Sequence, residues 1–303
     1  MSWKPIVVGV DRSPEAAEAA AFAWEVAQRA RTSCHLVHAT RDAWQADTAA
    51  ALPARLSELT QAQLLVAREQ VARSLELVLP PHMVEQLTVH RGRAALVLSD
   101  MVAELDAGLV VLGGKHHSTL GRWLGGSTSH DAVRLTNVPV LVVAGKPRPI
   151  KRVLVAVDLS PASRPTLELA AQYATLFGAR LRALCVFEPL PAPPESPEVD
   201  STAFYELCQQ TLDRDVWPAL QFPGAERMVR HGNAVEALLR ETNEWRADLL
   251  VVGSHGKNLA QRVLLGSVTE RLLSHLPTSL LVAHAAEPVR PRRRRRDVAA
   301  AAV

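Results

Sequence analysis

Residues 151–186 read KRVLVAVDLSPASRPTLELAAQYATLFGARLRALCV, and residues 4–39 read KPIVVGVDRSPEAAEAAAFAWEVAQRARTSCHLVHA. When the two stretches are aligned at an offset of 147, Asp158 falls on Asp11, and a Ser-Pro pair follows in both. Each stretch contains an apolar run, an acidic residue, a helical segment and a second apolar run. This order predicts a strand, a helix and another strand, the repeating unit of a parallel α/β sheet.

A second pair of matching segments completes the repeat. Residues 89–114 align with residues 229–254 at an offset of 140. The chain therefore contains two copies of one domain, residues 1–145 and 151–286, followed by a basic tail at 287–303 that is expected to be disordered. Apolar, β-branched runs alternate with helical stretches in each copy. The pattern predicts two five-stranded, Rossmann-like parallel sheets, each with about four helices covering both faces.

The two Ser-Pro pairs predict where the first helix of each copy begins. Ser13 precedes Pro14, and Ser160 precedes Pro161. A serine hydroxyl can accept a hydrogen bond from a free amide of the first turn, and a proline at the first helical position needs no such bond. Ser13 and Ser160 are therefore the predicted N-caps.

Composition and charge exclude several classes of protein. Apolar residues make up 48% of the 303-residue chain, but no apolar run approaches the roughly 20 residues of a membrane-spanning helix, so membrane insertion is not expected. The three cysteines form no CxxC pair, and the N-terminus lacks a secretory pattern, so we expect a cytoplasmic protein. The net charge of +3 depends on residues 290–297, which contribute +5. Nucleic-acid binding is therefore not expected, apart from weak contacts of the tail.

The glycine-rich segment of the second copy carries the functional signal. Residues 251–273 read VVGSHGKNLAQRVLLGSVTERLL, in which an apolar strand ends at Gly253 and an amphipathic helix follows Ser267. Glycines let backbone amides approach an anion, and a helix N-terminus attracts phosphate. The spacing of Ser267 and Glu270 predicts a capping box with Ser267 as the N-cap. Because Asp158 ends the first strand and would repel phosphates, we expect it to meet the sugar or base of an adenine-type nucleotide.

The segment GSHGKNLAQRVLLGS also resembles the G-x2-G-x9-G-[ST] nucleotide-binding pattern of the universal stress protein family. The resemblance extends over both halves, about 280 residues, and includes the acidic residue at the end of the first strand. It implies ATP as the ligand, with or without Mg²⁺, and assembly through the last strands. The implied contacts are Asp158 and Val186 beside adenine and ribose, and Gly253, Gly256, Gly266, Ser267 and Val268 beside ribose and phosphates.

The first copy departs from that pattern. In residues 111–133, VLGGKHHSTLGRWLGGSTSHDAV, His116 occupies the second glycine position and His130 replaces the glutamate of the capping box. A side chain in the cradle weakens or blocks a phosphate, so the first copy is the weaker nucleotide site. The adjacent histidines His116 and His117 have no third ligand nearby, so no metal site is predicted. The first-copy candidates are Asp11, Ala39, Gly113, Gly126 and Ser127.

Together these features favour an ATP-binding, stress-response regulatory protein with little or no catalysis. Two alternatives remain open: a slow ATPase or autophosphorylating enzyme that uses Asp158 and Ser267, and an interaction module for which ATP is irrelevant. No catalytic or metal-binding residue is assigned. The final strands, in residues 139–145 and 279–285, are apolar edges that invite pairing. We expect them to join the two halves as an internal pseudo-dimer, with a homodimer as a further possibility.

Overall fold

The computed structural model describes residues 3–40, 53–114, 128–146, 148–189, 201–254 and 265–284. The elements of the first half are β1 (Ile6–Gly9), α1 (Pro14–Ala30), β2 (Cys34–Thr40), α2 (Pro53–Leu75), α3 (Pro81–Glu85), β3 (Thr88–Arg91), α4 (Ala94–Glu104), β4 (Leu109–Gly114), α5 (Thr128–Leu135) and β5 (Val140–Ala144). Those of the second half are β6 (Arg152–Val157), α6 (Ser163–Phe177), β7 (Arg180–Phe187), α7 (Ser201–Thr211), a π-helical turn η2 (Leu212–Val216), a 3₁₀ turn η3 (Trp217–Ala219), β8 (Glu226–His231), α8 (Ala234–Glu244), β9 (Leu249–Gly253), α9 (Ser267–Ser274) and β10 (Ser279–Ala283).

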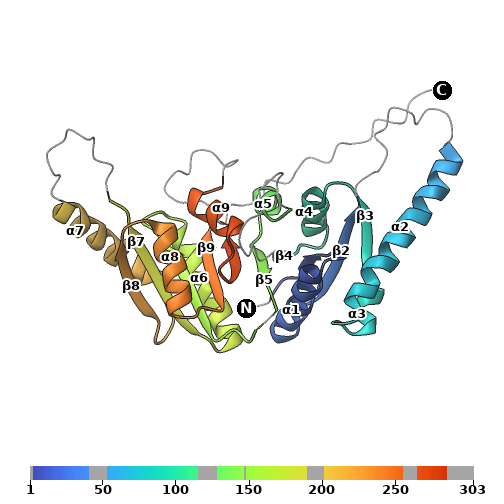
Figure 1. Ribbon diagram of the computed structural model, residues 1–303. Coiled ribbons are helices and arrows are strands. Elements are labelled where there is room, and N and C mark those ends of the chain that lie inside the picture. The colour runs from blue at the N-terminus through green and yellow to red at the C-terminus, as the bar shows by residue number, and fades with distance from the viewer. Residues whose placement is uncertain are drawn as a thin grey trace, which may run out of the picture.

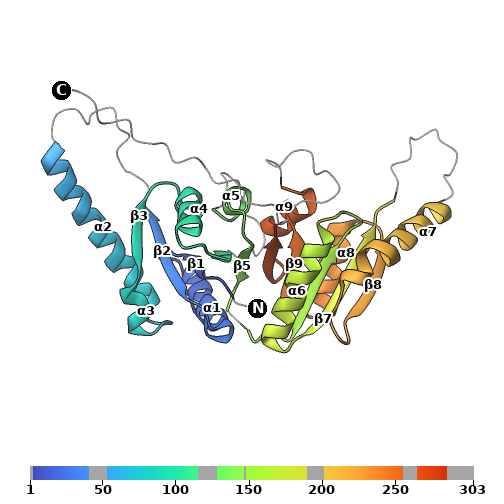
Figure 2. The same cartoon turned by 180° about the vertical axis from the view of Figure 1, so that it is seen from behind.

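The ten strands form one sheet in the order β3-β2-β1-β4-β5-β10-β9-β6-β7-β8. Every neighbouring pair is parallel except β5 and β10. Figures 1 and 2 show the two halves side by side, with helices on both faces of the sheet. The predicted fold class, a duplicated and mostly parallel α/β sheet, is confirmed.

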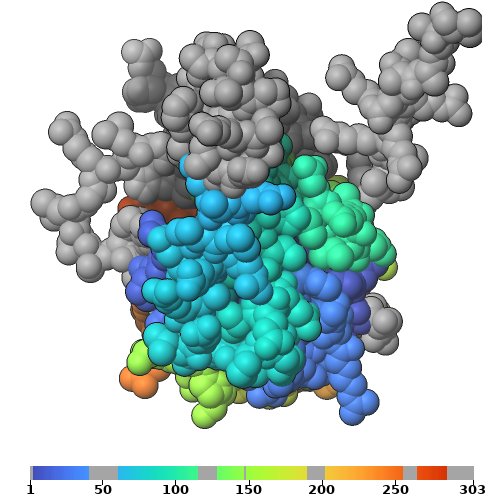
Figure 3. Space-filling view, turned by 90° about the vertical axis from the view of Figure 1, so that its right-hand side faces the viewer, coloured from blue at the N-terminus to red at the C-terminus, as the bar shows by residue number. Residues whose placement is uncertain are grey.

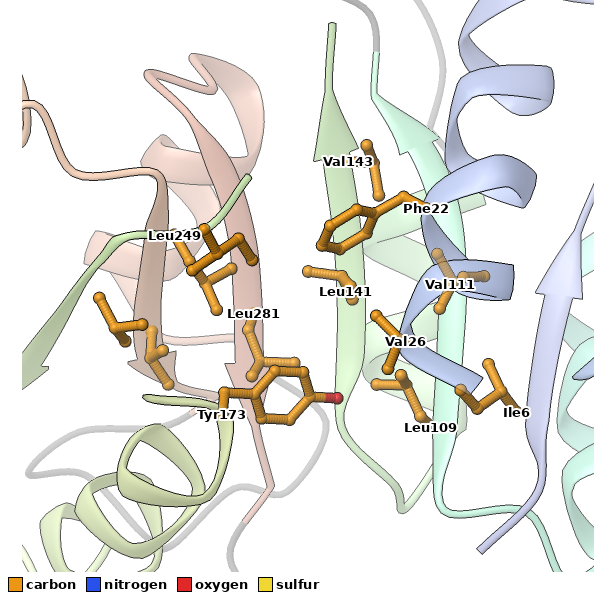
Figure 4. Close-up of a cluster of buried hydrophobic side chains, with 14 of the residues drawn as sticks. Ile6, Phe22, Val26, Leu109, Val111, Leu141, Val143, Tyr173, Leu249 and Leu281 are labelled. Atoms are coloured by element: carbon orange, nitrogen blue, oxygen red, sulfur yellow. The ribbon is translucent and has the colours of Figure 1, made fainter. Parts of the chain in front are cut away.

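The two halves join through their last strands. β5 and β10 pair antiparallel, with Leu141 opposite Leu281. Figure 4 shows buried apolar side chains from both halves gathered at this junction, among them Phe22 of α1 and Tyr173 of α6. The rings of Phe22 and Phe177 also stack across the junction at 6.0 Å. The hydrophobic core on this face is therefore continuous between the halves.

The helices divide into two layers. The layer that contains α1, α3 and α6 covers one face, together with the C-terminal part of α2. The layer that contains α4, α5, α8 and α9 covers the other face. Because both faces are covered, the central strands are apolar on both sides, as the near-continuous apolar runs predicted.

The start of α1 agrees with the sequence. Ser13 is the N-cap, and its Oγ accepts a hydrogen bond from the amide of Ala16 at 3.2 Å, while Pro14 is the first helical residue. The helix ends at Ala30, because Arg31 has φ 53° and turns the chain out of the helical conformation.

The end of the sheet at β3 is packed against α2, and residues of α2 and the segment that follows it form much of the surface seen in Figure 3. Among the residues that the structure describes, no helix is long and apolar enough to cross a bilayer.

Candidate functional site

The strand order places the candidate site at a switch point in each half. β1 lies between β2 and β4, and β6 lies between β7 and β9. In the second half Val155 is opposite Val251, so Asp158 and Gly253 leave the sheet at the same edge. In an open α/β sheet this is the edge at which ligands bind. Asp158 and Gly253, two strand-end residues of the predicted site, thus belong to neighbouring strands.

A tight turn holds the carboxylate of Asp158. Its Oδ1 accepts hydrogen bonds from the Ser160 amide at 2.9 Å and from the hydroxyls of Ser160 and Ser163. The prediction that Ser160 caps the helix was wrong, because α6 begins at Ser163 with Ala162 as its N-cap. The Ser160 hydroxyl donates a hydrogen bond to Asp158 instead. Ser163, which the sequence analysis missed, could have been found as a hydroxyl five residues after the strand-end acid.

The N-terminus of α9 is tied to the end of β9. The amide of Gly266 donates to the carbonyl of Ser254 at 2.9 Å, and the hydroxyl of Thr269 donates to the carbonyl of Gly253 at 2.7 Å. Ser254 is itself anchored to the sheet, since its amide donates to the carbonyl of Ala283 at 2.8 Å. These bonds fix where α9 begins relative to the carboxyl edge of the sheet. Ser254 and Thr269 are further residues that the sequence analysis did not single out.

The N-cap of α9 is Gly266, not Ser267 as predicted. Gly266 has an extended backbone (φ −61°, ψ 139°) and its carbonyl accepts from the Glu270 amide at 2.9 Å, so Ser267 is the first helical residue. A residue with helical dihedrals cannot return its side chain to the amides of its own first turn as an N-cap does. The φ of Gly266 also means that a glycine is not required there for backbone conformation.

The remaining second-half candidates lie nearby or outside the described residues. Val186 is half-buried near the end of β7, and Val268 is half-buried in the first turn of α9. Gly256 lies outside the described residues, as do the cationic side chains of the same loop. Beside Phe187, on the other face of β7 from Val186, the sequence analysis missed a stack of Tyr205 on His231, with ring centroids 4.3 Å apart. No spacing in the sequence brings these two rings together, because they come from α7 and β8.

The first half repeats the acidic turn, and its strand-end glycine packs against α1. Asp11 accepts from the amide of Ser13 at 2.8 Å and also from its hydroxyl. A Cβ at Gly113 would lie 2.6 Å from the Glu15 carbonyl, so this glycine lets α1 pack directly on the end of β4. Ala39 is half-buried in β2, whereas Gly126 and Ser127 lie outside the described residues, as does His116.

A pocket of about 290 Å³ lies away from both switch points, at the junction of the halves. It is lined by residues where β5 begins and β10 ends, together with Lys4 and the N-terminal part of α6. Asp158 and Gly253 do not line it, so this pocket gives no support to the nucleotide site.

Other chemistry finds little support in the part of the chain that is described. There, no three histidine, cysteine or acidic side chains gather as a metal ion would require. Cys34 is buried, and burial raises the pKa of its thiol to about 12, which keeps it in the unreactive thiol form.

His130, which replaces the capping-box glutamate, is 4% exposed where α5 packs against α9. Burial lowers the pKa of its imidazole below the usual 6.5, and the hydrogen bond to the Glu270 backbone and the Glu270 charge oppose this only in part. Asp131 opposes it as well, whereas Arg134 adds to the lowering. The neutral ring is therefore the stable form in the folded protein.

Acidification is accordingly expected to destabilise the fold through His130. The unfolded chain binds a proton at about pH 6.5 and the folded chain only at lower pH, so the contribution is complete above pH 6.5 and declines as the pH falls below it. Urea unfolding between pH 7.5 and 5.5 should show a steeper loss of stability for the natural chain than for His130→Gln. Identical pH profiles would contradict this assignment.

Comparison with known proteins places this architecture in a family. A model of the universal stress protein family matches the chain twice, over residues 2–144 and 149–284. A universal stress protein of Mycolicibacterium smegmatis is 29% identical over 298 residues, which cover 95% of this chain and 97% of the relative. Universal stress protein Rv2005c of Mycobacterium tuberculosis is 29% identical over 305 residues, covering 92% and 96%. The crystal structure of a universal stress protein from Archaeoglobus fulgidus matches with a TM-score of 0.65 at 17% identity, covering 93% and 98%.

The fold and the two switch points define a tandem α/β protein of the open, doubly wound class. Both family matches together extend over most of the sequence. The chain belongs to the universal stress protein family.

Proposed function

We propose that the second half binds an adenine nucleotide, ATP, across the carboxyl ends of β6 and β9. The observation that carries this proposal is the fixed N-terminus of α9, held by the bonds of Gly266 to Ser254 and of Thr269 to Gly253. The first-turn amides of a helix have no acceptor within it, and the helix dipole favours a phosphate there. Asp158 lies on the same edge, where a carboxylate suits a ribose hydroxyl or a base amine rather than a phosphate.

The proposed role is that of a cytoplasmic stress-response protein whose nucleotide alters its interactions with partners. Mg²⁺ would accompany the phosphates as an ion of the nucleotide. Little catalysis is expected, because Oδ1 of Asp158 already accepts hydrogen bonds within its own turn. Slow hydrolysis or phosphorylation of Ser267 is the alternative within the same site.

Proposed assembly follows from the last strands. β5 and β10 pair with each other. The strand edges through which two separate chains would otherwise assemble are therefore already paired within one chain. An internal pseudo-dimer is therefore the proposed arrangement, and a homodimer would need another surface, such as the outer edges at β3 or β8.

The nucleotide site is tested by Gly266→Arg combined with Ser267→Ala. The extended backbone at Gly266 accepts any residue, so the variant should fold, while the arginine side chain fills the position proposed for phosphate. We expect ATP affinity to fall about 100-fold or more in isothermal titration, a loss of about 2.7 kcal/mol. The matched control is Gly126→Arg with Ser127→Ala at the equivalent first-half positions, which should leave one ATP bound per chain.

Three outcomes decide between the candidate functions. Equal ATP affinity in the natural chain and the second-half variant would overturn the site. Loss of binding in the first-half control alone would move the site to the first half. Absence of ATP binding in all three proteins would favour the interaction module, in which nucleotide plays no part.

A further inference from the structure

Equivalent helices of the two halves, α5 and α9, meet at the junction, but their side chains there differ. With the repeat offset of 140, position 130 of α5 corresponds to position 270 of α9, and these two helices pack against each other. A symmetric pair would place identical side chains at this position. Here His130 meets Glu270: its ring hydrogen-bonds to the Glu270 backbone, and the guanidinium of Arg134 reaches the Glu270 carboxylate at 3.5 Å.

These charges are complementary only between unlike halves. Two second halves placed together would bring Glu270 against Glu270, and the residue equivalent to Arg134 is Ser274, which carries no charge. Two first halves would place the neutral ring of His130 against its own copy and leave Arg134 facing His130 in place of a carboxylate. Like charges at a contact oppose association, whereas the observed combination places a cation beside a carboxylate.

The shapes of the side chains at the junction also favour the pairing of unlike halves. A Cβ built on Gly114 would lie 2.3 Å from Cδ1 of Leu276 and 2.8 Å from Cγ1 of Val142 in the first half, so the leucine of the second half occupies part of the space that glycine leaves free. The counterpart of Gly114 is Ser254, and the counterpart of Leu276 is Thr136. Two second halves would therefore press Leu276 onto a serine Cβ. Two first halves would set the smaller threonine over the glycine and leave a void.

Two hydrogen bonds across the junction also disfavour a pair of first halves, because each needs a side chain of the second half. Nε2 of His284 lies 2.7 Å from the carbonyl of Val133, and the counterpart of His284 is Ala144, which has no polar side chain. The amide of Ala144 donates to Oγ of Ser279 at 3.2 Å, and the counterpart of Ser279 is Pro139, which has no hydroxyl. Charge, shape and hydrogen bonding thus agree in disfavouring a pair of first halves.

We propose that this junction is a pairing surface selective for unlike halves: a first half accepts a second half of this chain and rejects another first half. The partner surface is defined by a carboxylate at position 270, a leucine at 276 and a hydroxyl at 279. Because only residues 145–151 separate β5 from β6, the second half of the same chain is present at a high effective concentration and is the expected partner. The proposal concerns assembly and does not depend on nucleotide binding.

The full-length chain can imitate each rejected pair by a single substitution. Gly114→Ser gives the first half the residue of the second, and His130→Glu sets a carboxylate against Glu270, so both imitate two second halves. Leu276→Thr and Glu270→His imitate two first halves. Hydrogen exchange of the β5 and β10 amides reports opening of the junction, with the β1 and β6 amides of the same sample as internal references.

Each single variant is expected to speed exchange at β5 and β10, Gly114→Ser by about tenfold or more, while β1 and β6 stay protected. Combining Gly114→Ser with Leu276→Thr removes the clash with Leu276, although the contact with Val142 remains. Exchange at β5 and β10 in the double variant should therefore be slower than the rate obtained by multiplying the two single accelerations. The controls are Leu77→Thr and His275→Glu at exposed positions, which should leave exchange unchanged. Unchanged exchange in Gly114→Ser, or strictly multiplicative effects in the combined variant, would overturn the proposal.

Discussion

Gly113→Ala should lower the free energy of unfolding by about 2–3 kcal/mol, although it adds only one methyl group. The added Cβ would lie 2.6 Å from both the carbonyl carbon and oxygen of Glu15 and 2.8 Å from the amide nitrogen of Ala16. These are backbone atoms in the first turn of α1, so no flexible side chain can move aside. The whole helix must shift, and α1 carries a row of buried alanines and Phe22 against the sheet.

Urea unfolding followed by circular dichroism measures this effect. Ala103→Val, which adds methyl groups at an exposed position of the same half, serves as the control and should change stability by about 0.7 kcal/mol or less. The ATP affinity proposed for the second half should not change, because Gly113 belongs to the first-half switch point. A stable Gly113→Ala variant would show that α1 does not pack on β4 as described.

Gly113 also shows how much of the candidate site could be predicted from the amino-acid sequence alone. The repeat and the strand-end position of Gly113 predicted where the residue would lie, at the carboxyl end of β4. The reason for the glycine was not predictable, because a ligand and a helix backbone both require the absence of a Cβ. Only the packing of α1 distinguishes them at this position.

The fold was predictable because its signals are local and repeated. Apolar runs, strand-end acids and a constant offset between copies determine strands and their neighbours with little help from distant residues. Helix starts were less predictable. Ser13 caps α1 as its motif indicates, but the same motif at Ser160 fails because Asp158 and Ser163 draw the turn into a different hydrogen-bond arrangement. The contacts at the junction were not predictable, since they depend on which unlike residues meet across two strands.

The largest loss of stability in the second half is expected for Glu241→Ala, about 3–5 kcal/mol. Only 5% of the Glu241 side chain is exposed, and its carboxylate pairs with Arg182, whose side chain is 16% exposed. Arg182 also lies over the ring of Trp245 at 4.4 Å and pairs with Glu226. Removing Glu241 deprives Nη1 of Arg182 of its acceptor in a site with little access to water, while Glu226 still faces the guanidinium, and that cost exceeds the loss of a surface ion pair.

Comparison with two further variants separates the buried charge from simple loss of packing. Glu244→Ala removes an exposed carboxylate from the same helix and should change stability by less than about 1 kcal/mol. Replacing Glu241 and Arg182 together by methionine removes both charges while keeping apolar volume, so much of the stability lost in Glu241→Ala should return. If the double variant is as unstable as Glu241→Ala, the ion pair itself stabilises the fold. If Glu241→Ala and Glu244→Ala are equally mild, Arg182 is satisfied by Glu226 and Trp245 without Glu241.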